Sequence, residues 1–380
     1  MTDEQSSRLP ADFRRSVLLF ALTAASVFYT AWTSSPGYEA AHFGRAALIY
    51  GAQFTGALLS ILLAHELGHY VAARIHGVPA SLPYFIPMPY LSPFGTMGAV
   101  IRMSGRIPTR KALLDIGASG PLAGLTVAIP MYLWGAAHSS FVPLLGKNDG
   151  IFLGESILTK LFDRIAVGPT PEGMDLMLSP VAFAAWAGLF VTMINLLPVG
   201  QLDGGHVAYA LFGPRQDKHS VIVHRSLLAL FFVSVASFAA RDLRAGIGFT
   251  QLGRHLMSSM FWLVWFEVLG VIGSLSQPPA QGDADAPVMS NGVRIFGLVG
   301  LIALAWYGQN GDVNPLFWLA WFAGLGLLLA MERKGGSLRA TPLLDHPPTS
   351  ATPLTLGRKI VAVITLLFFA LLFMPSPMVM

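Results

Sequence analysis

The chain has 380 residues, of which 54% are hydrophobic and only 12% are charged, with a formal net charge of +4. Soluble domains carry roughly 25% charged residues, so this composition indicates a protein that crosses a membrane several times. No basic run with interleaved aromatic residues occurs, which argues against nucleic acid as a partner. Cysteine is absent, so disulfides and thiolate metal sites are excluded, and any metal would bind His, Asp, Glu or water.

Nine apolar segments are candidates for membrane-spanning helices, because each approaches the roughly 20 apolar residues that a span needs. They are residues 16–33, 46–73, 115–137, 179–197, 222–239, 257–275, 293–307, 316–331 and 360–376. Residues 1–45 are expected to hold an N-terminal tail and the first span. Residues 216–380 are expected to hold further C-terminal transmembrane helices joined by flexible linkers, of which 276–292, rich in Pro, Gly and Ser, is one.

The distribution of basic residues predicts the orientation of these spans. With the N-terminus in the cytoplasm, most of the 24 Lys and Arg residues fall in cytoplasmic segments, as the positive-inside rule requires. This orientation places residues 102–111 in the cytoplasm and the loop 138–178 on the opposite side.

The segment 79–105, "PASLPYFIPMPYLSPFGTMGAVIRMSG", separates the second and third predicted spans. Its many Pro and Gly residues and its short apolar alternations favour a β-hairpin or re-entrant loop over a helix. Backbone of this kind is stable at membrane depth only where protein or a water-filled cavity covers it.

The second predicted span contains the pattern H-E-x-x-H, formed by His65, Glu66 and His69. Residues four apart lie on one face of a helix, so the two imidazoles can bind one zinc ion while Glu66 lies beside it. This arrangement is typical of metal-assisted hydrolysis with the Glu as general base. The alternative is a chance match on an amphipathic helix, but ionisable groups within spans are costly and usually functional.

A catalytic zinc ion takes three protein ligands and keeps one open position. A third ligand is available in "INLLPVGQLDGGHV", residues 194–207, where an apolar span reaches Asn195, breaks at Pro198 and leads to Asp203. His206, just beyond the bend, and Glu267, in the sixth span, are the rival candidates. Alternatively, Glu267 has no role in metal binding and pairs with Arg225 or faces water.

The two motifs together resemble those of the site-2 protease family of intramembrane zinc metalloproteases. H-E-L-G-H is paired with N-x-x-P-x-x-x-x-D-G, and "FGTMGAV" at 94–100 and "GASGPLAG" at 117–124 also resemble segments of that family. The resemblance covers residues 46–215 and is closest to the branch that lacks a peptide-binding insertion. It implies an all-α polytopic membrane protein, in which a three-span metalloprotease core with a re-entrant or hairpin loop has additional flanking helices.

The resemblance also implies roles for individual residues. His65, His69 and Asp203 would bind one zinc ion per chain, and Glu66 would be the catalytic base. Asn195 would contact the substrate or the tetrahedral intermediate, although a packing role is an alternative. Gly95 and Gly98 would let a substrate strand pair with the loop, the alternative being that both serve a plain turn.

The expected function is zinc-dependent hydrolysis of peptide bonds within or next to transmembrane segments of single-span membrane proteins, in regulated intramembrane proteolysis. The expected location is the bilayer of a bacterial inner membrane, with a cytoplasmic N-terminus. Two alternatives stay open: a proteolytically silent regulator with the protease fold, and a metal-dependent transporter. Transport is disfavoured because a transport site needs no general base and no internal repeat is visible.

Overall fold

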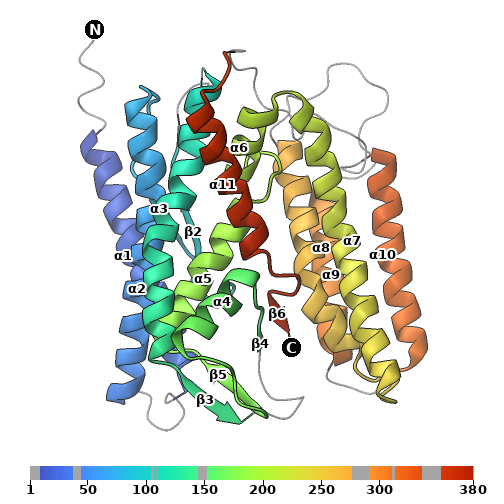
Figure 1. Ribbon diagram of the computed structural model, residues 1–380. Coiled ribbons are helices and arrows are strands. Elements are labelled where there is room, and N and C mark those ends of the chain that lie inside the picture. Colours follow the sequence, from blue (N-terminus) through green and yellow to red (C-terminus); the bar gives the residue numbers. More distant parts are fainter. Residues whose placement is uncertain are drawn as a thin grey trace.

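The computed structural model describes residues 9–36, 44–103, 107, 109–143, 152–275, 291–309, 313–335 and 352–379. Most of these residues form helices, and three short two-stranded sheets complete the fold (Figure 1). The helices are α1 Leu9–Thr33, α2 Arg45–Ile75, α3 Arg110–Ala137, α4 Ile157–Ala166, α5 Pro180–Asn195, α6 Asp203–Phe212, α7 Arg215–Arg244, α8 Leu252–Leu275, α9 Asn291–Gln309, α10 Pro315–Gly335 and α11 Leu356–Leu372. The strands are β1 Tyr84–Pro87, β2 Thr96–Val100, β3 Ser140–Pro143, β4 Phe152–Leu153, β5 Met174–Met177 and β6 Met378–Val379.

The predicted all-α polytopic architecture is confirmed, and every predicted span coincides with a helix. Within the described ranges, however, six helices are long and apolar enough to cross a membrane: α1, α2, α3, α7, α8 and α9. Three of the nine candidate segments, in α5, α10 and α11, do not meet this criterion within the described residues. Helix α5 has 16 residues, about 24 Å, which is shorter than the roughly 30 Å hydrocarbon core. It ends at Asn195 because Pro198, shortly after it, cannot continue the helix.

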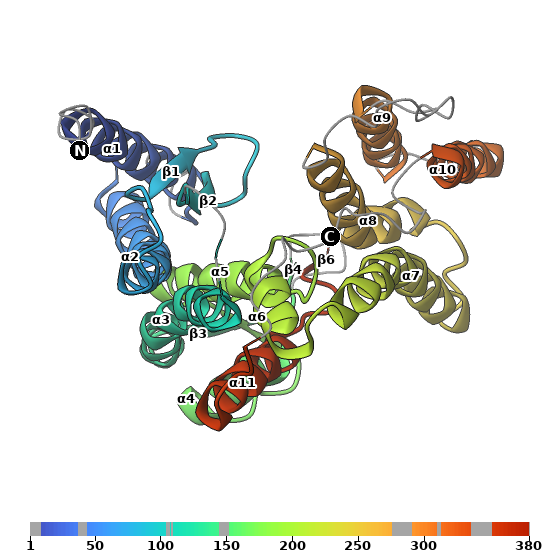
Figure 2. The ribbon, with the colours of Figure 1, turned by 90° about the horizontal axis from the view of Figure 1, so that it is seen from above.

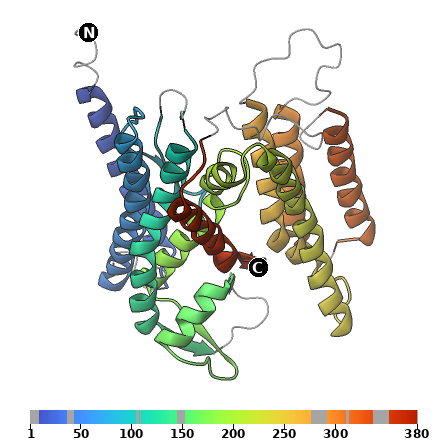
Figure 3. The same ribbon diagram turned by 45° about the horizontal axis from the view of Figure 1, so that its top comes forward.

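The helices form two groups when they are seen from above (Figure 2). Helices α1 to α6 make one group and α7 to α10 the other. Helix α11 follows α10 in the sequence but contacts α3 and α6, so the chain returns to the first group (Figure 3). Beyond α11, strand β6 pairs with β4, which ties the C-terminal end to the segment between α3 and α5.

Small residues bring α2, α3 and α5 into close backbone contact. A Cβ on Gly68 of α2 would overlap the backbone carbonyl of Ser119 in α3, and one on Gly135 of α3 would overlap the backbone of Ala182 in α5. Small residues serve the same purpose at many helix interfaces in membranes, because they let neighbouring backbones approach. Helix α2, which contains the histidine motif, is therefore held directly against α3.

The predicted hairpin is present as the antiparallel pair β1 and β2, in which Tyr84 lies opposite Val100. Phe85 of β1 packs edge-on against Phe20 of α1, with ring centroids 5.0 Å apart, so the hairpin is fixed to the first helix. In the predicted loop 138–178, the structure places the hairpin β3–β5 and helix α4. Most of the predicted linker, residues 276–290, lies outside the described residues.

Candidate metal centre

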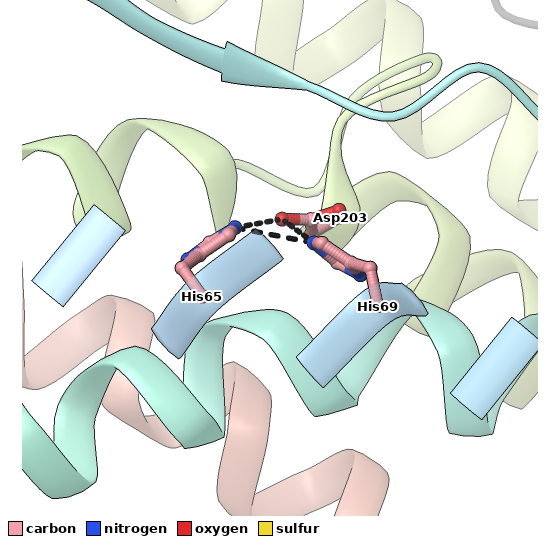
Figure 4. Close-up of side chains that lie close together, drawn as sticks. All are labelled: His65, His69 and Asp203. Atoms are coloured by element: carbon pink, nitrogen blue, oxygen red, sulfur yellow. Dashed lines mark hydrogen bonds and ion pairs between the residues drawn. The ribbon is translucent and has the colours of Figure 1, made fainter. Parts of the chain in front are cut away.

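His65 and His69 project from one face of α2, one turn apart, as the motif spacing predicts. Their Nε2 atoms are 3.1 Å apart, and only 5% and 11% of the two side chains is exposed (Figure 4). Two imidazoles with converging ring nitrogens can share one metal ion.

Asp203 reaches the same point from the first residue of α6. Its Oδ2 atom lies 3.2 Å from Nε2 of His65 and 3.3 Å from Nε2 of His69. The glycines that follow make this position possible, because a Cβ on Gly204 would overlap the Leu196 carbonyl and one on Gly205 would overlap the Gly200 carbonyl. The Asp-Gly-Gly sequence thus lets α6 start directly against the bend and point its carboxylate inward.

The three donor atoms fit a zinc ion. A tetrahedral ion with bonds of about 2.0–2.1 Å separates its ligand atoms by about 3.3–3.4 Å, close to the 3.1–3.3 Å spacings found here. Two imidazole nitrogens and one carboxylate oxygen are also a donor set that zinc accepts in catalytic sites. Within the described ranges, this is the one group of three His, Asp or Glu side chains close enough to hold an ion.

A backbone carbonyl fixes the ring of His69. Nδ1 of His69 lies 2.8 Å from the carbonyl oxygen of Ile116 in α3. A carbonyl only accepts, so Nδ1 carries the hydrogen and donates it, and in the neutral ring the Nε2 lone pair is then available to a metal ion. Such outer contacts orient metal ligands and set their tautomer. Ile116 itself is 1% exposed, so its carbonyl is held firmly.

Glycines in α3 leave space for both imidazoles. A Cβ on Gly120 would overlap the His69 ring, and one on Gly124 would lie 3.3 Å from the His65 Cβ. These glycines belong to the segment "GASGPLAG". Because these glycines have no side chain, the segment can pack against the two histidines.

The donor group lines a cavity of about 220 Å³. Glu66, which is 8% exposed, lies in its wall beside the two histidines. Residues 99–101, at the end of β2, form another part of the wall, and Gln201 from the bend contributes a polar side chain. The cavity therefore brings together a metal-binding group, a carboxylate and the edge of a strand.

Asn195 and the rival ligands are placed differently. Asn195, predicted as a contact to the substrate, lines the cavity, and its Nδ2 lies 3.4 Å from Nε2 of His65. His206 also lines the cavity but is not one of the three grouped donors. Glu267 is buried in α8 and does not line this cavity. The geometry therefore favours Asp203 over both rivals.

The two predicted loop glycines do not line the cavity. Gly95 (φ +74°) packs against α1, where a Cβ would meet the backbone of Val27, and its carbonyl accepts a 2.6 Å hydrogen bond from Ser26. Gly98 (φ +100°) lies in β2, with open space around the position of a Cβ. Both need a backbone conformation that favours glycine. A role in substrate binding stays a prediction for each.

Two supporting residues carry no signal in the sequence. The Gln216 side chain donates a 2.8 Å hydrogen bond to the Pro198 carbonyl and so holds the bend before Asp203. Arg110, the first residue of α3, donates to the carbonyls of Ala210 and Leu211 at the end of α6. From the sequence, Arg110 could be predicted only to be a cytoplasmic basic residue, because its hydrogen-bond partners lie about 100 residues away.

This part of the chain is similar in sequence to known proteins. Residues 53–236 match the model of peptidase family M50. The probable zinc metalloprotease EGY2, chloroplastic, of Oryza sativa subsp. indica is 34% identical over 173 residues, or 43% of this chain and 29% of the relative. The probable zinc metalloprotease EGY1, chloroplastic, of Arabidopsis thaliana is 36% identical over 161 residues, or 41% and 29%.

The probable zinc metallopeptidase EGY3, chloroplastic, of Arabidopsis thaliana is 31% identical over 173 residues, or 42% of this chain and 29% of the relative. The chain thus covers less than a third of the length of these relatives. No solved structure gives a significant match. The matched residues contain the histidine motif, Asn195 and Asp203, so this part of the chain is similar to peptidase family M50, the family of the site-2 proteases.

Proposed function

We propose that the chain is a zinc-dependent endopeptidase that cleaves its substrates within or next to their transmembrane segments. One observation carries the proposal: the Nε2 atoms of His65 and His69 and Oδ2 of Asp203 form a triangle with sides of 3.1–3.3 Å beside a buried glutamate. The match to peptidase family M50 and the names of the relatives, printed as probable zinc metalloproteases, support the same reading.

His65, His69 and Asp203 would hold the ion, with Glu66 as the base. Bound zinc lowers the pKa of a water ligand from 15.7 to about 7 and polarises a scissile carbonyl. Glu66 would remove a proton from the attacking water as its oxygen bonds to the carbonyl carbon. It would then return that proton to the amide nitrogen as the C–N bond breaks. Glu66 lies in the cavity wall beside the three metal-binding side chains.

Two neighbours would support this chemistry without transferring a proton. The Asn195 amide, close to His65, is placed to donate to a carbonyl oxygen of the substrate or of the tetrahedral intermediate. The Ile116 carbonyl would keep the His69 ring in the orientation that binds metal.

The substrates we propose are single-span membrane proteins processed in regulated intramembrane proteolysis. A peptide bond in a transmembrane helix is hidden by helical hydrogen bonds, so the segment must unwind before it can be cut. Residues 99–101, at the end of strand β2, lie in the cavity wall. An unwound substrate segment could form hydrogen bonds with their backbone.

The chain is a multi-pass membrane protein, and we place it in a bacterial inner membrane with its N-terminus in the cytoplasm. Ile116 lies about six residues, or roughly 9 Å, from the start of α3. Because α3 begins on the side of the N-terminal end of α1, the metal site would open near the cytoplasmic face (Figure 1).

Cleavage of a single transmembrane peptide by the purified full chain in liposomes tests the function. We expect cleavage with zinc, loss on chelation, recovery on adding zinc back, and loss in Glu66→Gln. A silent regulator would bind zinc without cleaving any of a panel of such peptides. A transporter would move metal across the liposome membrane, with Glu66→Gln leaving that flux unchanged. Either result would overturn the proposal.

A further inference from the structure

Helix α4 is short, with ten residues, and has apolar side chains on both a buried and an exposed side. Its buried side contains Leu158 and Phe162, which pack toward α3. A second apolar stripe faces away from the protein: Ile157, Leu161 and Ile165, with 65%, 50% and 65% of their surfaces exposed. Their spacing of four residues aligns them along one side of the helix. Nothing within the described residues covers this stripe.

Basic side chains flank the exposed stripe. At about 100° per residue, Lys160 and Arg164 lie on the polar side of the helix, next to Ile157. Both are exposed, and Lys160 pairs with the equally exposed Glu155 across 3.3 Å. An apolar stripe bordered by Lys and Arg is the pattern of helices that lie in a membrane interface, where the basic groups meet anionic headgroups.

The depth of α4 agrees with such a position. Helix α3 has 28 residues and is about 42 Å long, so its ends extend about 6 Å beyond a centred hydrocarbon layer of about 30 Å. Helix α4 is fixed to α3 at Tyr132, whose hydroxyl donates a 2.9 Å hydrogen bond to Asp163. Tyr132 lies about five residues, or roughly 8 Å, before the end of α3. This level is the boundary between hydrocarbon and headgroups.

Neighbouring features mark the same boundary. Trp134 of α3 is 54% exposed and stacks on His138, with ring centroids 4.1 Å apart. Exposed tryptophans concentrate at membrane–water interfaces. The two-stranded β3–β5 sheet lies further toward that end of the molecule than α4 (Figure 1). Helix α4 thus lies at a level between the spanning helices and the β3–β5 sheet.

We propose that α4 is an interfacial anchor, which inserts Ile157, Leu161 and Ile165 into the bilayer leaflet opposite the N-terminal side and places Lys160 and Arg164 among anionic headgroups. Because Tyr132 and Phe162 tie α4 to α3, the anchor sets the depth of the helix whose Ile116 carbonyl orients His69.

The absence of cysteine allows a direct test with single cysteines in the full chain, labelled with an environment-sensitive fluorophore in liposomes. We expect labels at Ile157, Leu161 and Ile165 to be quenched by lipids with a nitroxide near the headgroup and protected from aqueous iodide. A label at Lys160, on the same helix, is the matched control: at the level of the headgroups it should also be quenched by the nitroxide lipid but stay accessible to iodide. The stripe labels should also emit at shorter wavelength when the vesicles contain phosphatidylglycerol than when they contain phosphatidylcholine alone. Lys160→Gln with Arg164→Gln should remove that difference.

Two results would overturn the proposal. Iodide quenching of the stripe labels equal to that at Lys160 would show that the stripe faces water. Protection from both quenchers would show that protein, such as a second copy of the chain, covers the stripe. Bound zinc, measured in each labelled protein, verifies that the fold is intact, and the fluorescence result is independent of whether the chain cleaves peptides.

Discussion

Asp115 in α3 and Arg358 in α11 form a two-point ion pair although they are 243 residues apart in the chain. Nε of Arg358 donates to Oδ1 across 3.0 Å, and Nη2 donates to Oδ2 across 2.9 Å. Nε2 of His76, at the end of α2, also lies 2.9 Å from Oδ2. One carboxylate therefore joins three helices, and it directly precedes Ile116, whose carbonyl orients a ligand histidine.

Replacing Arg358 should loosen this junction. Arg358→Gln removes the charged partner of Asp115, whose side chain is 28% exposed, so we expect a loss of about 1–2 kcal/mol in the free energy of unfolding. Thermal unfolding of the purified protein in detergent measures the effect. The neighbouring exposed Lys359→Gln is the matched control and should change stability little. Equal stability of both variants and the parent protein would show that α11 is not held by this pair.

The space around His69 can be tested with one methyl group. Gly120→Ala places a Cβ within the His69 ring, so the imidazole must leave its position against the Ile116 carbonyl. We expect Gly120→Ala to bind zinc much more weakly while α3 stays helical. Gly56→Ala, in α2 where a Cβ meets open space, is the control and should bind zinc normally. Normal zinc binding by both variants would contradict the observed packing.

The local part of the site could be predicted from the sequence, because helical periodicity alone puts His65 and His69 on one face. Asp203 could be predicted as their partner from the break at Pro198 and the two glycines, which have little other use in an apolar span. The pairing of β1 with β2 followed from Pro and Gly content. These signals are local: each depends on residues within about one or two turns of one another.

Contacts between distant segments could not be predicted in the same way. Nothing near Arg358 points to Asp115, and nothing near Gly95 points to its contact with α1. Apolar composition alone also does not distinguish a span from a helix buried in protein: α5 has 16 residues and is mostly buried by its neighbours. Helix α4 was hidden in a predicted loop, because it is too short for a span signal.

Removing the charge of Asp203 should separate metal binding from catalysis. Asp203→Asn keeps the size of the side chain but removes the anionic oxygen that lies against both histidines. We expect zinc affinity to fall by more than the roughly 10- to 100-fold typical of losing an outer-shell partner. Glu66→Gln should keep bound zinc and lose at least about 100-fold in cleavage rate. Dialysis against zinc buffers measures the first effect; unchanged affinity in Asp203→Asn would exclude Asp203 as a ligand.

Asp163 should make stability depend on pH. Burial raises the pKa of Asp163 to about 6, although the hydrogen bond from Tyr132 opposes the rise. The folded protein then binds a proton that the unfolded chain, with an ordinary pKa near 4, has already lost. Stability from this group is therefore present at low pH and is lost as pH rises from about 4 to about 6. Asp163→Asn should be more stable than the parent at pH 7.5 and lose this advantage near pH 4.5, as measured by thermal unfolding. An equal difference at both pH values would contradict the assignment.

The orientation of the spans predicts which faces react with impermeant reagents. Helix α1 runs from the N-terminal side to the far side and α2 returns, so Arg102 should lie in the cytoplasm and the segment between α3 and α5 outside it (Figure 1). Ser156 in that segment is a poor position for a label, since it is 2% exposed and caps α4. Exposed Glu172 is better. In bacterial cells whose outer layers admit the reagent, an impermeant maleimide should label Glu172→Cys while the inner membrane is intact. It should label Arg102→Cys only after that membrane is opened. The opposite pattern would invert the orientation, and with it the face from which water and substrate reach His65, Glu66 and His69.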